Sequence, residues 1–143
     1  MSRIINPDSV GNERTRLTKA IVLAVRGLAQ QSEPGGESRD FAAFIALALF
    51  TIEETIDVSV AAWEKRGYWV KADRFRMEWT WAGILAEKMR LAVQTEDWGT
   101  VAAVAALTAQ KLYKVNVPAR NRLGKPWEGA WEEMKRRKLS PGD

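Results

Sequence analysis

The segment from Ser38 to Arg66 constrains the fold more than any other part of this 143-residue chain. Its apolar residues recur at helical spacing along one face, from Phe41 to Trp63, and a second apolar face passes through Leu47. A helix that is apolar on two faces is buried on both, so it lies among several helices or is shared with a second subunit. The segment therefore predicts an all-α fold built around this helix.

Helical periodicity accounts for nearly all of the remaining chain, and no alternating strand pattern of useful length interrupts it. The predicted helices span about residues 12–31, 38–66, 68–94, 98–115 and a short segment that begins near Pro126. Ser38 is the expected cap of the second helix and Asp97 belongs to the cap of the fourth. We expect a single domain over residues 1–143, folded as a four-helix bundle with a short additional C-terminal helix. Residues 1–11 form an N-terminal arm in this prediction, and residues 116–143 form a basic loop plus the short helix.

Composition narrows the class of function. The chain contains no histidine and no cysteine, which removes the commonest general base, the thiol nucleophile and the usual transition-metal ligands. We therefore expect a binding module rather than an enzyme, with no cofactor. The longest apolar run, Phe41 to Phe50, is about half of the roughly 20 residues that cross a bilayer. We expect a buried helix there, no membrane association and a cytoplasmic location.

Positive charge is concentrated near the C-terminus. From Lys111 onward the chain carries nine Lys and Arg against four acidic residues, whereas its formal net charge is +4. A basic region on a near-neutral body favours a polyanion, such as the nucleic-acid backbone, or an acidic protein partner. The candidate residues for this contact are Trp69, Arg76, Arg90, Arg120, Arg122, Lys125, Lys135, Arg136, Arg137 and Lys138.

Four tryptophans lie among basic residues between positions 63 and 81. Trp63, Trp79 and Trp81 fall on apolar stripes, which is typical of core residues. Trp69 instead shares a polar strip with Arg76 and Arg90. An exposed indole between two arginines suits stacking or partner docking, although the same residue is equally suited to covering the turn after Gly67.

A charged cluster is predicted where the second and third helices pair. Glu54 lies on the apolar stripe that passes through Leu47, where burial would require a compensating cation. Antiparallel pairing about Gly67 brings it level with the region of Arg74 and Glu78. We expect a buried ion cluster of Glu54, Arg74 and Glu78 that fixes the register of the two helices.

The same region supports an alternative function. Glu53 and Asp57 are one helical turn apart, and together with Glu54 they offer carboxylate oxygens to Mg²⁺ or Mn²⁺. This arrangement resembles that of the all-α nucleotide pyrophosphohydrolases, although the third helix has no matching acidic pair. The resemblance implies metal-dependent hydrolysis of a nucleotide or another phosphate substrate.

Assembly follows from the two apolar faces of the second helix. Surplus apolar surface on Phe44, Leu47, Phe50 or Val58 would stay exposed unless another subunit covered it. We expect a homodimer, with this helix or the helix that carries Trp127 and Trp131 at the contact.

Overall fold

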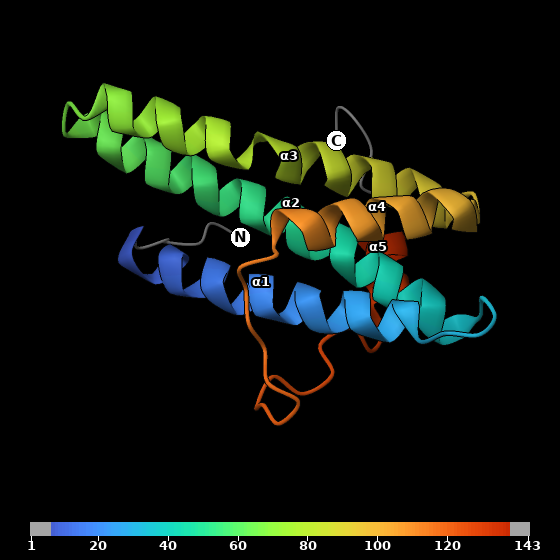
Figure 1. The fold of residues 1–143 in the computed structure, drawn as a ribbon. Helices are drawn as coiled ribbons and strands as arrows, with labels where there is room; N and C mark the ends of the chain where they lie inside the picture. The colour runs from blue at the N-terminus through green and yellow to red at the C-terminus, as the bar shows by residue number, and fades with distance from the viewer. Residues whose placement is uncertain (1–6, 138–143) are drawn as a thin grey trace.

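The computed structural model describes residues 7–137, in which all regular secondary structure is helical. Five helices follow one another along this part of the chain (Figure 1). Their bounds are α1 (Pro7–Ala29), α2 (Gly36–Lys65), α3 (Trp69–Gln94), α4 (Trp98–Lys111) and α5 (Ala130–Arg137). The prediction of an all-helical chain with four longer helices and a short fifth one is confirmed for the described residues.

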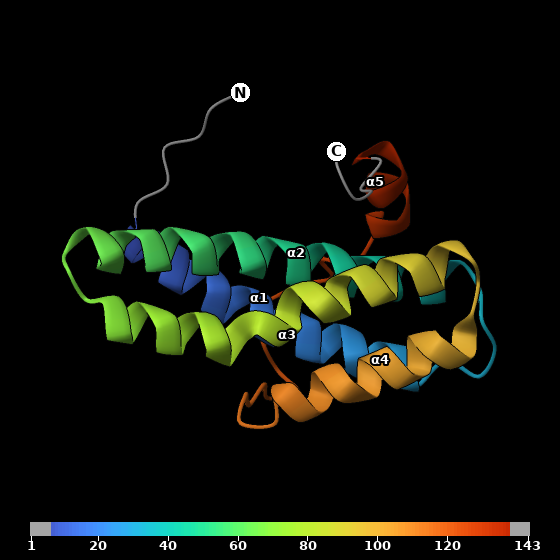
Figure 2. The ribbon, with the colours of Figure 1, turned by 90° about the horizontal axis from the view of Figure 1, so that it is seen from above.

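The central helix is α2, which contacts each of the other four helices. Figure 2 shows α5 on one side of α2, with α3 and α4 on the other side. Ile45, Leu49 and Ile52 of α2 are completely buried. Full burial of an aliphatic side chain of this size contributes about 1.5–3 kcal/mol, so the middle of α2 is the main source of apolar stabilisation.

Little of the apolar surface that α2 was expected to leave exposed is fully open to solvent within one chain. Leu47 is buried, and Phe44, Phe50 and Val58 are half-buried. The reason is that α5 packs against α2 within the same chain and covers the part of the second apolar face near Leu47. The homodimer itself stays a prediction, and at its expected contact on α2 only the partly exposed sides of Phe44, Phe50 and Val58 remain.

Two helix ends differ from the predicted bounds, namely the start of α1 and the end of α4. Helix α1 begins at Pro7, so residues 7–11 are helical rather than part of an arm, in keeping with the preference of proline for a first turn. Residues 1–6 of that arm lie outside the described residues. Helix α4 ends at Lys111, earlier than predicted, because β-branched Val115 and Pro118 follow and disfavour helix continuation.

The caps of α2 and α4 explain where these helices begin. Gly35 is the capping residue of α2, and its N–H donates to Ser38 Oγ at 3.2 Å, so Ser38 lies inside the first turn rather than at the cap. Asp97 caps α4 as predicted, accepting from Thr100 N–H at 3.2 Å and from Thr100 Oγ at 2.7 Å. The hydroxyl and backbone bonds from Thr100 lower the pKa of Asp97.

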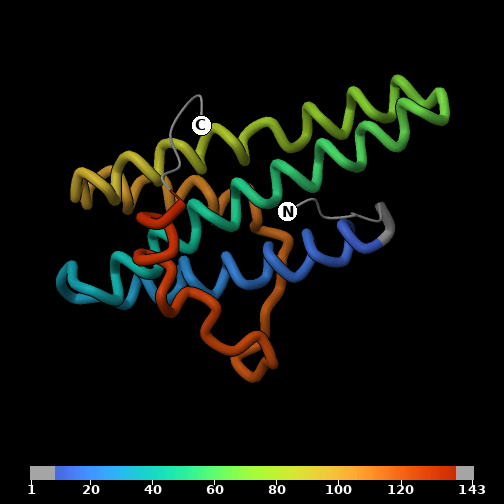
Figure 3. Tube along the Cα trace, turned by 180° about the vertical axis from the view of Figure 1, so that it is seen from behind, coloured from blue at the N-terminus to red at the C-terminus, as the bar shows by residue number. Residues whose placement is uncertain are grey.

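The chain reaches α5 by passing around α1. Figure 3 shows the segment after α4 running beneath α1 before it turns back towards α2. Arg26 of α1 donates to the carbonyl oxygen of Val117 at 2.8 Å and fixes this segment. On the far side, the Trp127 ring lies 5.0 Å from the Phe41 ring, and Met134 is fully buried.

Helix α4 covers only part of its neighbours. With 14 residues it is about 21 Å long, whereas α3 has 26 residues and is about 39 Å long. Figures 1 and 2 show α4 beside the C-terminal half of α3, with the N-terminal half of α3 extending beyond it. None of the helices within residues 7–137 combines the length and the apolar content needed to cross a membrane.

Candidate functional site

A groove opens where α4 ends. It has a volume of about 610 Å³ and is lined by Arg14, Thr15, Thr18 and Lys19 of α1, Trp79 of α3 and residues 111–116. We call it the α1–α4 groove. It exists because the short α4 leaves the space between α1 and α3 without a covering helix.

Arg14 lines the α1–α4 groove and is the partly buried cation of its lining. It lies on the same helical stripe as Val10, Leu17 and Ile21, all of which are buried, so its side chain is directed towards the core. Its Nη2 donates to the Thr55 carbonyl oxygen at 3.1 Å and to Ser59 Oγ at 2.8 Å. Helix α2 thus holds the guanidinium through neutral acceptors.

The charge of Arg14 has no anionic partner within residues 7–137. Nε donates to Thr55 Oγ at 3.1 Å, and the guanidinium carbon lies 4.8 Å from the centre of the Phe75 ring. Burial lowers the pKa of Arg14. The side chain nevertheless stays charged, because the ordinary pKa of an arginine lies far above neutral pH. Nη1 has no hydrogen-bond partner among the described residues. The site therefore offers free donors on a partly desolvated cation.

Three lysines complete the charge of the groove. Lys19 comes from α1, whereas Lys111 and Lys114 come from the end of α4, and all three are exposed. No acidic residue of the described chain lines the groove, and none of these lysines forms an ion pair there. Such a collection of uncompensated cations produces a positive potential that attracts anions.

Two aromatic rings lie beside these cations. Trp79 lines the groove and stacks on Trp81, with ring centres 5.6 Å apart. Tyr113 is 75% exposed, and Lys114 Nζ lies 5.6 Å from its ring. An exposed ring with a flat apolar face suits stacking of a planar ligand.

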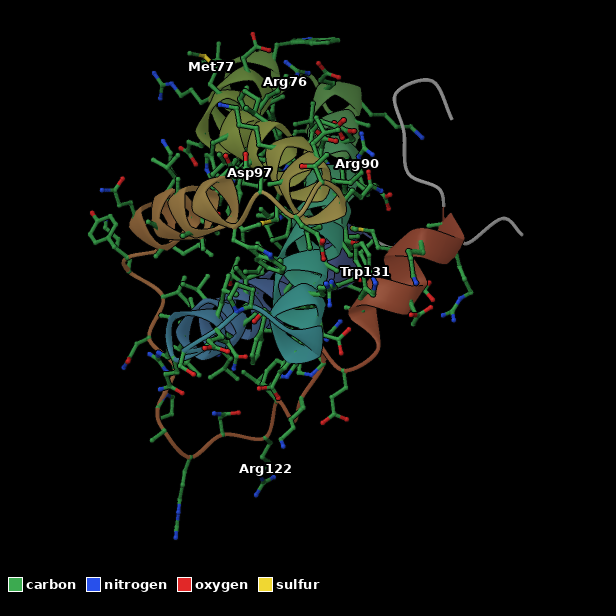
Figure 4. The ribbon with its side chains drawn as sticks, turned by 90° about the vertical axis from the view of Figure 1, so that its right-hand side faces the viewer. Arg76, Met77, Arg90, Asp97, Arg122 and Trp131 are labelled. Carbon is green, nitrogen blue, oxygen red and sulfur yellow. The ribbon has the colours of Figure 1, made fainter. Side chains whose placement is uncertain are left out.

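The basic loop continues from the groove. Arg120, Arg122 and Lys125 are exposed in the segment between α4 and α5, and none forms an ion pair within residues 7–137. Arg122 points away from the helices in Figure 4. These three predicted residues are therefore available for contact with an anion.

The other predicted basic residues are compensated. Lys135 pairs with Glu132 at 3.0 Å, and Arg136 and Arg137 both pair with Glu133, whose pKa they lower through these hydrogen bonds. Lys138 lies outside the described residues. The basic face predicted for α5 is therefore largely neutralised by acids of the same helix.

The structure does not assemble the Trp69 surface as predicted. Trp69 is exposed, but Arg76 is engaged by Glu64 at 3.0 Å and by Asp73 at 2.7 Å. Arg90 is 5% exposed and binds Glu87 and Gln94, so the expectation of a surface arginine is wrong there. An arginine can be buried in this way when acceptors of its own helix, here Glu87 and Gln94, bind its guanidinium.

The prediction of a buried cluster of Glu54, Arg74 and Glu78 is also wrong. All three are exposed, and no ion pair within the described chain joins them. The α2 face that carries Glu54 is covered near Leu47 by the eight-residue α5, which is too short to reach Glu54. Arg74 and Glu78 lie on the part of α3 that extends beyond α4.

Glu53 differs in its surroundings from Glu54 and Asp57, the other two carboxylates predicted as possible metal ligands. The Glu53 carboxylate lies directly over Gly83 of α3, where a Cβ would come within 1.7 Å of Oε2. Burial, followed by the charges of Asp57 and Glu54, raises the pKa of Glu53. Within residues 7–137, no group of three or more acidic side chains is arranged so that it could hold a metal ion. The geometry therefore gives the hydrolase alternative no support.

Sequence reasoning missed the most constrained residue of the groove. Arg14 occupies a charged position on the otherwise apolar stripe of α1, a pattern that is visible in the sequence. In the sequence, Lys111 and Lys114 were counted only as part of the positive charge near the C-terminus.

Comparisons of this chain with protein-family models, with curated proteins and with solved structures find no match.

Proposed function

We propose that this protein is a non-enzymatic helical module that binds a polyanion, namely the nucleic-acid backbone, in the α1–α4 groove. One observation carries the proposal: Arg14, Lys19, Lys111 and Lys114 line a single groove without an acidic residue of the described chain. Neutralising phosphates with such cations releases counterions, which is the main source of affinity for nucleic acids. The three free cations of the basic loop extend the same positive track.

We infer that the four longer helices form a four-helix bundle in which the fourth helix is short. In such a bundle, α1 and α3 would normally be separated by α4 along their whole length. The early end of α4 leaves the groove and places Tyr113 and Lys114 at its rim. We infer that the short helix serves ligand access.

The aromatic rings favour a single strand over a duplex. Base stacking on Trp79 or Tyr113 needs unpaired bases, and each stacked base contributes about 1–3 kcal/mol without sequence preference. A duplex offers phosphates alone to these side chains. We expect binding with little dependence on sequence and with a preference for single-stranded nucleic acid.

The test is a titration of a labelled single-stranded oligonucleotide, followed by fluorescence anisotropy at several salt concentrations. The variant Lys111→Gln/Lys114→Gln should weaken binding about tenfold and reduce the salt slope by about 1.4, because two phosphate contacts are lost. The matched control Lys135→Gln/Arg137→Gln removes the same charge from cations that already have acidic partners, and it should bind nearly as the wild type does.

The outcomes are distinct. A duplex of equal length should bind more weakly than the single strand. Absence of binding to either oligonucleotide at low salt would contradict the proposed function. An equal loss of affinity in both double variants would show that net charge acts without the groove.

A further inference from the structure

Helix α3 carries a row of large apolar residues on its outer side. Val70, Met77, Ile84 and Leu91 are 67%, 76%, 53% and 49% exposed, and they recur every seven residues. We call this row the α3 outer stripe. Figure 4 shows Met77 at the outer edge of the molecule, pointing away from the other helices.

The stripe is too long and too regular to be a scatter of surface residues. It extends over three heptads, or about 32 Å at the rise of an α-helix. The opposite side of α3 is already packed, since Ala82, Ala86 and Met89 are buried in the core. Single exposed apolar residues are common, but four of them in a row along one side of a helix are typical of a contact surface. A spacing of seven keeps the four residues on one side of the helix, where they can meet the same row of a second helix, although the positions three residues after each of them are polar.

Charges border the stripe in a fixed order. Asp73 and Glu87 lie three residues after Val70 and Ile84, on one edge. Arg74 and Lys88 follow one position later and lie on the other edge. Arg74 and Lys88 form no ion pair within residues 7–137, whereas Asp73 binds Arg76 and Glu87 binds Arg90. One edge, which we call the acidic edge, thus carries two acids that already have partners in their own chain, and the other, the basic edge, carries two cations without such a partner.

We propose that the α3 outer stripe is the contact surface for a second copy of this chain, with the two α3 helices parallel and in register. In this pairing each apolar residue meets the same residue of the second copy. The acidic edge of one helix faces the basic edge of the other, because a two-fold axis along parallel helices exchanges the edges. Asp73 then faces Arg74 of the second copy, and Glu87 faces Lys88 of the second copy.

The charges oppose the antiparallel arrangement. An antiparallel pair can also match the apolar rows, with Val70 against Leu91 and Met77 against Ile84 of the second copy. Its two-fold axis, however, places like edges together. Arg74 then faces Lys88 of the second copy, and like charges at such positions destabilise a helix pair. Charge complementarity therefore selects the parallel dimer, and its ionic contacts predict weakening by salt.

Sedimentation equilibrium tests association. The wild type should show a concentration-dependent dimer in the micromolar range that weakens as salt is raised. Met77→Asp and Ile84→Asp should each weaken the dimer roughly tenfold or more, because they place a charge in the apolar row. Circular dichroism verifies that the helices are intact. A wild type that remains monomeric at high micromolar concentration would overturn the proposal, as would a dimer that both variants retain.

Cysteine cross-linking tests the direction of the helices, since the natural chain has no cysteine. The single variant Met77→Cys should form a disulfide-linked dimer under mild oxidation, and so should Ile84→Cys. Leu107→Cys is the control, because Leu107 is an exposed apolar residue of α4 away from the stripe. If cross-links form only when the Met77→Cys and Ile84→Cys proteins are mixed, the helices are antiparallel and the proposed pairing is wrong.

Discussion

Arg14 occupies a position that an apolar residue would normally fill. Its neighbours along the stripe are core residues, yet the guanidinium finds only hydroxyl and carbonyl acceptors and the face of Phe75. Partial burial of a cation without a carboxylate partner lowers the stability of the folded state unless an anionic ligand binds beside it. This residue joins the core to the proposed ligand site, since it is held by acceptors on α2 and also lines the α1–α4 groove.

Glu53 gives a prediction that depends on pH. Its pKa is raised in the folded state, so the ionised carboxylate is less stable there than in the unfolded chain. Below the unfolded pKa of about 4.3 both states are protonated and the effect vanishes, whereas above the folded pKa the full cost is present. Glu53→Gln should therefore raise the free energy of unfolding at pH 7 by about 0.5 kcal/mol.

Urea unfolding at pH 7 and at about pH 3.5 measures this effect. The gain from Glu53→Gln should shrink towards zero at the lower pH. Glu78→Gln is a suitable control, because Glu78 is also exposed on a helix but lies outside the cluster with Glu54 and Asp57. A gain that is equal at both pH values would exclude ionisation of Glu53 as its cause.

At the scale of the element, periodicity predicts that a helix exists but not how far its neighbours cover it. The two apolar faces of α2 and the bounds of α3 followed from apolar spacing and from Gly67. The exposure of Glu54 could not be predicted in this way, because it depends on how far α5 extends along α2. The open groove likewise depends on the last residue of α4, and helix ends are weakly encoded in sequence.

The site was partly predictable for a similar reason. Counting charge identified the C-terminal region, including Arg120, Arg122 and Lys125, which the structure leaves free. The count also included Lys135, and the polar strip beside Trp69 suggested Arg76, but both have acidic partners three residues earlier on the same helix. Three-residue spacing is visible in sequence and predicts such pairing. The sequence does not show where a side chain lies in the tertiary structure, and the burial of Arg90 could therefore not be predicted from it.

A matched pair of substitutions separates the core from the outer stripe. Ile45 of α2 is fully buried, whereas Ile84 of α3 is 53% exposed. Ile45→Ala removes the same atoms as Ile84→Ala but leaves a cavity, and it should lower the free energy of unfolding by about 2–5 kcal/mol. Ile84→Ala should change it by no more than about 0.5 kcal/mol in the monomer.

Urea unfolding of both variants at low protein concentration, where a micromolar dimer dissociates, makes this comparison. Raising the concentration should then reveal a loss for Ile84→Ala alone, since only the stripe depends on a second copy. A large loss for Ile84→Ala in the dilute monomer would show that α3 is packed on its outer side within one chain.

At the scale of the whole molecule, the basic loop connects the open α1–α4 groove to the packed helix α5. It starts at the open groove beyond α4, is fixed to α1 through Arg26 and Val117, and ends at α5 on the far side of α2. A dimer through α3 would bring two grooves into one particle. Two weak phosphate-binding surfaces joined in this way can bind one extended ligand more tightly than either does alone.

The docking of α5 depends on Asp40, and this dependence gives the prediction for the whole fold. Asp40 lies in the first turns of α2, where its two carboxylate oxygens accept from Gly129 N–H at 3.2 Å and from Trp131 N–H at 3.0 Å. These amides belong to the N-terminal end of α5, which lacks partners within its own helix. Asp40→Ala should therefore destabilise the docked α5 by about 1–2 kcal/mol.

Amide hydrogen exchange followed by mass spectrometry locates that loss. Because α5 is short and contacts only α2 among the helices, its release should be a local opening rather than global unfolding. Exchange should become faster in residues 130–137 and in the part of α2 beneath them, while α3 and α4 keep their protection. Asp40→Asn retains one acceptor oxygen and should lie between the wild type and Asp40→Ala. Faster exchange throughout the chain would mean instead that α5 and the other helices unfold as one cooperative unit, and that α2 cannot keep its second apolar face uncovered even briefly.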